Sequence, residues 1–163
     1  MSRYHRLAGN LSAAFEWAGN AVAFAARVGY QHFYGRALVE RARVAWLRGD
    51  PTEAEADLVT ADEVLASLGA ALDLAYARLL RAALLHATCP ASPRAREAWL
   101  AAAQAIEQGG YTFLLEQERP LALRLVAAYL SSPDAGAAAL AKSLLAHLGR
   151  LPPPPLRIVT LGA

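Results

Sequence analysis

Glycine recurs at a fixed interval along this chain of 163 residues. Gly29, Gly69, Gly109 and Gly149 are each separated by 40 residues, and each follows an apolar run with helical spacing. Because glycine adopts the left-handed conformation at low cost, a glycine in this position is typical of a helix end. A constant period of this length indicates a repeat protein, in which each unit stacks on its neighbours to bury its apolar face.

Helix starts recur with nearly the same period. Asp50-Pro51, Ser92-Pro93 and Ser132-Pro133 each place an N-capping side chain before a proline at the first helical position. Gly9-Asn10 repeats this turn, without the proline, 40 residues before Gly49-Asp50. We expect residues 1–8 to be the end of one helix, followed by helices at 11–28, 30–47, 51–68, 71–88, 93–108, 111–130 and 133–148.

The predicted fold is therefore all-α. It is an α-solenoid of helix hairpins with a period of about 40, roughly seven helices and an N-terminal helix stub. Pro120 falls inside the helix expected at 111–130. Because proline removes a backbone donor and clashes with the preceding turn, we expect it to kink this helix or to end its first half.

Composition excludes several classes of protein. Apolar residues make up 56% of the chain and charged residues 18%, which is unlike a disordered protein. The net charge of +2 gives no basis for direct nucleic-acid binding, which usually needs a concentrated basic patch. No segment resembles a transmembrane helix or a signal peptide, and the single cysteine, Cys89, fits a reducing compartment. We expect a cytoplasmic protein without a membrane partner.

Two parts of the chain carry a resemblance to known families. Helix pairs with a Gly-Asp turn, as in LRGDPTEAEADL, resemble tetratricopeptide repeats, whose usual period is about 34 residues. The longer period, the LASLG-type helix ends and the segment GGYTFLLEQERPLALRLVAAYL are similar to the helical repeat region of large bacterial transcription activators of the maltose-activator type. In SARP-type relatives this region precedes a winged-helix domain whose first strand resembles the LRIVTLG found at 156–162.

The resemblance implies a domain organisation and a function. Residues 1–149 are expected to form tetratricopeptide-like repeats, and residues 150–163 a proline linker and the first strand of a truncated following domain. The implied function is that of a regulatory domain of a multidomain transcriptional regulator. It would bind a small-molecule inducer, a partner protein or another domain of the regulator, and relay the signal to the DNA-binding domain. The alternative is a generic helical-repeat scaffold with no role in transcription, and either could self-associate.

Motifs for chemistry are absent from the sequence. No nucleophile elbow or phosphate-binding loop is found, so we predict no catalytic residues, no cofactor and no enzyme activity. His86 and Cys89 could share a helix face, but zinc needs three or four ligands and no second pair exists. We therefore predict no metal site, a core cysteine and a partly exposed histidine.

Charged side chains suggest one candidate binding face. Arg36, Arg78 and Arg119 recur once per repeat on the first helix of each pair, which usually lines the concave face of a solenoid. Glu40 and Arg43 share with Arg36 a helix face away from the apolar stripe. These residues could bind an acidic ligand, a peptide or a partner domain, or could simply form salt bridges between repeats.

Other side chains are given structural roles. Asp57, Asp62 and Glu63 are interpreted as a solvated helix face, and Glu116 and Glu118 as carboxylates that offset a helix dipole. The aromatic residues are expected mostly in the core: Phe15, Trp17, Phe24, Trp46 and Trp99.

Overall fold

The structure, a computed structural model, describes residues 1–148, and all of its regular elements there are helices. They are α1 (Ser2–Leu7), α2 (Leu11–Val28), α3 (Gln31–Leu47), α4 (Pro51–Ser67), α5 (Ala71–Thr88), α6 (Pro93–Gly109), α7 (Phe113–Gln117), α8 (Arg119–Tyr129) and α9 (Ala135–Leu148). The predicted all-α solenoid is confirmed. Gly149 and the linker and strand predicted for 150–163 lie outside the described residues.

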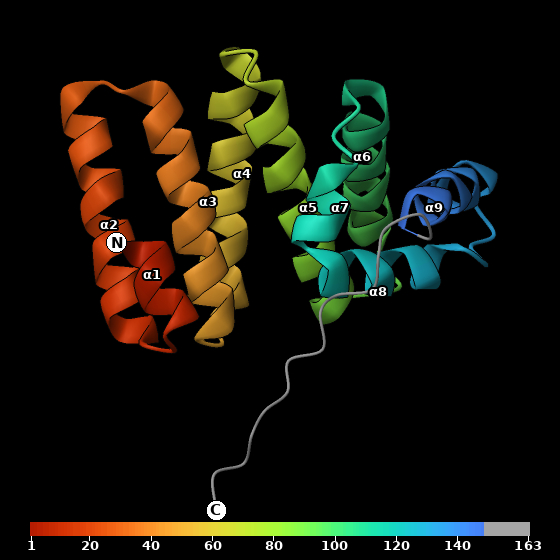
Figure 1. Cartoon of the computed structure of the whole chain (residues 1–163), viewed down its shortest axis with the longest axis horizontal. Helices are drawn as coiled ribbons and strands as arrows, with labels where there is room; N and C mark the ends of the chain where they lie inside the picture. Colours follow the sequence, from red (N-terminus) through yellow and green to blue (C-terminus); the bar gives the residue numbers. More distant parts are fainter. Residues whose placement is uncertain (149–163) are drawn as a thin grey trace, which may run out of the picture.

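Consecutive helices pack against each other along the molecule. Figure 1 shows α2 to α6 standing side by side along the long axis, with α8 and α9 at the end opposite α1. Each hairpin also contacts the next one, since α3 touches α1 and α5, α8 packs on α5, and α9 packs on α6. None of the helices formed by residues 1–148 is long and apolar enough to cross a membrane.

Local capping explains where several helices begin and end. The side chains of Asn10, Asp50 and Ser92 accept hydrogen bonds from backbone amides three residues later, at 3.1, 2.9 and 3.1 Å. These bonds satisfy donors that a helix start leaves without an intrahelical partner. Gly29 and Gly69 end their helices with φ of +74° and +64°, as the glycine period predicts.

Several predicted boundaries differ from the observed ones by one or two residues, and two of these differences have a clear local cause. Gly109 is still helical, and Gly110 takes the left-handed conformation with φ of +68°. A side chain at Gly109 would collide with the ring of Tyr111, which lies over it. The last helix starts at Ala135 and not at Pro133, because Asp134 accepts from the amide of Ala137 at 3.0 Å and so provides the cap expected from Ser132.

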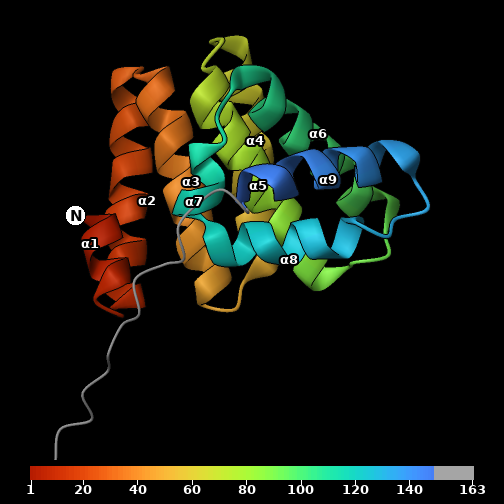
Figure 2. The ribbon, with the colours of Figure 1, turned by 45° about the vertical axis from the view of Figure 1, so that its right-hand side comes forward.

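Pro120 divides the seventh predicted helix into two. α7 ends at Gln117, α8 begins at Arg119, and Glu118 between them has φ of −115° and ψ of 33°. The prediction that Pro120 ends the first half of this helix is thus confirmed, and it accounts for the additional helix. The break changes the direction of the chain, so that α8 lies across the upright helices in both Figure 1 and Figure 2.

The core consists of two clusters of buried side chains that meet at α5. Leu79 belongs to the cluster shared with α6, α8 and α9, whereas Leu80 belongs to the cluster shared with α3 and α4. Trp99 is fully buried and stacks on Tyr129 with ring centroids 5.1 Å apart, as expected for a core aromatic. Trp17 and Phe24 are half exposed, so the core assignment is wrong for these two residues.

Candidate binding groove

A groove with a volume of about 760 Å³ runs across α1, α3, α5 and α7. α3 supplies one face of its helix to the groove, with Phe33, Arg36, Ala37, Glu40 and Arg43 at helical spacing. The four helices are the first members of successive hairpins, and α2 closes the groove near the N-terminus through Trp17. The groove therefore crosses the repeats and does not lie within a single hairpin.

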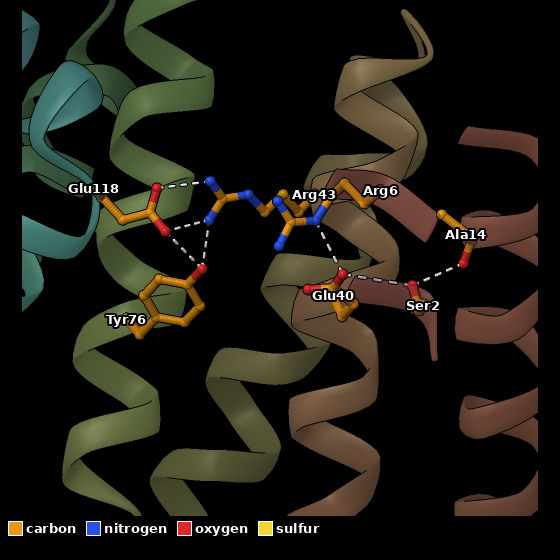
Figure 3. A network of polar contacts seen from close by, with 7 residues as sticks. All are labelled: Ser2, Arg6, Ala14, Glu40, Arg43, Tyr76 and Glu118. Atoms are coloured by element: carbon orange, nitrogen blue, oxygen red, sulfur yellow. Dashed lines mark hydrogen bonds and ion pairs between the residues drawn. The ribbon is translucent and has the colours of Figure 1, made fainter. Parts of the chain in front are cut away.

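A buried ion pair joins distant parts of the chain at the floor of this groove. Arg43 donates to both carboxylate oxygens of Glu118, and the bond to Oε2 measures 2.7 Å. Tyr76 accepts from Arg43 at 2.6 Å and donates to Glu118 Oε1 at 3.0 Å. Figure 3 shows Arg43 reaching from α3 toward α5 and the junction between α7 and α8. The three side chains connect three successive repeats.

Burial and neighbouring charge explain the pKa values of Arg43 and Tyr76. Burial alone would lower the pKa of Arg43, but the hydrogen bonds and negative charge of Glu118 outweigh it and raise that pKa. Burial raises the pKa of Tyr76 to about 12, because the phenolate would lose its hydration there. At neutral pH the groove floor thus holds a charged guanidinium and a neutral phenol.

A second polar network lies in the same groove, toward the N-terminus. Glu40 accepts from Arg6 Nε at 3.0 Å, and Ser2 donates to the carbonyl oxygen of Ala14 at 2.8 Å. Ser2 also lies 3.5 Å from Glu40, so that these bonds hold α1 against α2 and α3 (Figure 3). Together the two networks hold α1, α3, α5 and α7 in register.

Large apolar side chains recur along the groove, one for each hairpin. Phe33, Leu72 and Phe113 are separated by 39 and 41 residues, and they lie near the starts of α3, α5 and α7. Their exposed fractions are 47%, 41% and 52%, and Trp17 adds a further half-exposed ring. We call these four side chains the apolar row. They offer a ligand a series of hydrophobic contacts spaced by the repeat.

The five predicted binding residues have different surroundings. Arg36, Glu40 and Arg43 line the groove, whereas Arg78 and Arg119 do not. Arg36 is mostly exposed, with its Nε 3.5 Å from Asp73 on α5. Arg78 binds Asp62 of α4 at 2.7 Å, and Arg119 binds Glu116 at 2.8 Å. The three arginines thus pair locally and do not converge on one point.

Sequence reasoning missed several residues of this region. Glu118 was assigned to a helix dipole, yet it is buried because the Pro120 break turns it toward Arg43. Asp57 was assigned to a solvated face, yet it is buried and accepts two bonds from Arg41 at 2.6 and 2.7 Å. A signal was present for Asp57, because it lies three residues after Ala54 and one before Leu58, on the apolar face of α4.

His86 and Cys89, which the sequence places on one helix face, have different surroundings. Cys89 is exposed at the end of α5, so the prediction of a core cysteine is wrong. His86 is only partly buried, as expected, and it lies on the wall of a different cavity. Among residues 1–148, no group of three or more histidine, cysteine, aspartate or glutamate side chains is arranged to hold a metal ion.

The groove offers a binding surface made of apolar side chains above mutually paired charges. Comparison of the chain with protein-family models, with curated proteins and with solved structures finds no match. The geometry of the groove is therefore the basis for a functional proposal.

Proposed function

We propose that this chain is the helical-repeat interaction domain of a multidomain bacterial transcriptional regulator. In this proposal the groove receives a peptide segment, supplied by a partner protein or by another domain of the regulator. The observation that carries the proposal is the apolar row, because its large side chains stay half exposed in one groove. Contiguous exposed apolar surface of this kind marks interaction sites in proteins that otherwise bury such side chains.

The spacing of the row favours an elongated ligand. Phe33, Leu72 and Phe113 lie on three helices of successive hairpins, so a ligand that touches all of them must cross the repeats. The Arg43–Tyr76–Glu118 network ties the same three parts of the chain together. A groove held in this way loses little conformational entropy on binding, which favours affinity.

The role in transcription rests on the resemblance of the repeats and of LRIVTLG to transcription activators. A regulatory domain of this type would convert ligand binding into a change of domain arrangement, through a difference in ligand affinity between two states. The gene sequence downstream of the codon for Ala163 tests this part of the proposal. We expect it to encode a winged-helix domain, and a reading frame that ends after Ala163 would favour the scaffold alternative.

Peptide binding can be tested independently of transcription. Peptides selected from a random display library on the full chain would be measured by calorimetry against Phe33→Ala and Phe113→Ala variants. We expect each substitution to weaken binding about tenfold or more, because truncation of a central aromatic contact typically costs over 1 kcal/mol. Phe24→Ala is the matched control, since Phe24 is also half exposed but does not line the groove. Equal losses in all three variants, or no enriched peptide, would contradict the proposal.

A further inference from the structure

A second cavity, with a volume of about 600 Å³, lies between α5, α8 and the end of α3. It shares no lining residue with the groove. Its walls are mainly apolar, and they include the side chains of Trp46, Leu121 and Leu125. The volume falls within the range of about 300–1,000 Å³ typical of small-molecule sites.

The break at Pro120 explains why space is left here. α8 starts in a new direction and packs on α5 through its buried side, including Leu125. Several of the lining positions carry small side chains: Ala83, Ala87 and Ala127. The cavity is therefore a consequence of helix direction combined with alanine at its wall.

Two polar groups on this wall lack a partner within the described part of the chain. Arg124 is exposed, and its guanidinium makes no ion pair or hydrogen bond with any of residues 1–148. Nδ1 of His86 is buried and has no hydrogen-bond partner there either. Buried polar atoms in proteins usually have a hydrogen-bond partner, either a protein group or a bound molecule, so this nitrogen can accept or donate a bond to a ligand.

The charge of the wall selects the ligand class. Among residues 1–148, no carboxylate lines this cavity, whereas Arg124 supplies a positive charge that has no partner among these residues. An apolar ligand with a single negative charge would match both the walls and this guanidinium, since arginine binds carboxylates through paired N–H donors. A neutral apolar ligand would leave Arg124 unused.

We propose that this cavity is a binding site for a small amphipathic carboxylate with an aromatic or branched apolar part. The apolar part lies against Trp46, Leu121 and Leu125, and the carboxylate binds Arg124 at the edge, with His86 as the second polar group of the wall. This site is separate from the groove, so it does not depend on peptide binding.

The test compares two probes that differ only in charge, 1-naphthaleneacetate and 1-naphthaleneacetamide. Both are titrated into the full chain while the backbone amide signals are followed by NMR. We expect saturable shifts in α5 and α8 with the acid, and binding of the amide about fivefold weaker, as for a partly exposed ion pair worth about 1 kcal/mol. Arg124→Gln should weaken binding of the acid by the same factor and leave the affinity for the amide unchanged.

A steric variant provides the second measurement. Ala127→Phe places a ring at the cavity edge from an exposed helix position, so the fold should persist while both probes lose binding. Ala128→Phe is the matched control, because Ala128 is also exposed on α8 but does not line the cavity. The proposal is overturned if the acid gives no saturable shifts in α5 and α8. Equal affinities for acid and amide, or an unchanged affinity in Arg124→Gln, would overturn it as well.

Discussion

Replacement of Glu118 by alanine should reduce the free energy of unfolding by about 3 kcal/mol. The Glu118 side chain is only 5% exposed, and it accepts bonds from two nitrogens of Arg43 and from Tyr76. Its removal leaves a guanidinium and a phenol in a site built for a carboxylate. Loss of one partner from a buried pair typically costs about 3–5 kcal/mol. Because the Arg43 side chain keeps 19% exposure and can regain some water, we expect the lower end of this range.

A double-mutant cycle separates the ion pair from other effects of the substitution. Arg43→Met and Glu118→Leu are made singly and together, and urea unfolding is followed by circular dichroism at 222 nm. Each single variant leaves an unpaired buried charge, whereas the double variant leaves none. We therefore expect the double variant to be at least about 2 kcal/mol more stable than the sum of the single losses predicts.

The exposed pair of the same helix is the control for this experiment. Arg36→Gln removes the contact with Asp73, but Arg36 is 61% exposed, so the loss should stay below about 1 kcal/mol. If the losses of Arg43→Met and Glu118→Leu add within about 0.5 kcal/mol, the two residues are not coupled and the reasoning is refuted.

Three further outcomes are expected. Gly110→Ala should destabilise the chain by about 1 kcal/mol, because the φ of Gly110 is +68°. Gly19→Ala should instead stabilise it by up to about 1 kcal/mol, because Gly19 lies in the middle of α2 with open space around it. Thermal melts that rank the two variants in the opposite order would contradict this expectation. Trp99→Ala should cost about 3–5 kcal/mol by urea unfolding, and a loss below about 1 kcal/mol would show that Trp99 is not a core residue. Tyr76 has a folded-state pKa raised from 10.0 to about 12, so its contribution to stability is present below pH 10 and is lost as the pH rises toward 12. Urea unfolding at pH 9 to 12 should therefore show a weaker pH dependence in Tyr76→Phe than in the parent chain, and identical profiles would argue against this pKa.

The binding groove could be anticipated only in part. Arg36, Glu40 and Arg43 were placed together because they share one helix face, and helical spacing alone decides that. Phe33, Leu72 and Phe113 also follow the repeat period, but their period does not reveal whether they point into a neighbour or into a groove. Whether an aromatic side chain is covered depends on the next hairpin, as the half-exposed Trp17 shows.

The local architecture of this protein follows from residues that are close together in the chain. Three features depend only on residues a few positions apart: the caps at Asn10, Asp50 and Ser92, the left-handed glycines, and the break at Pro120. Each can therefore be predicted from a short segment of the sequence. Repetition of these signals then specified a solenoid, since hairpins with one apolar face must stack.

Tertiary structure alone decided which charges are buried and which partners they have. Arg43 and Glu118 are 75 residues apart, and they meet only because the break after α7 turns Glu118 back toward α3. No local rule marks such a pair, because each residue would be an ordinary solvated charge on an isolated helix. The physical reason is that burial of a charge is set by the packing of whole hairpins, and its pairing by which side chains that packing brings within hydrogen-bond distance.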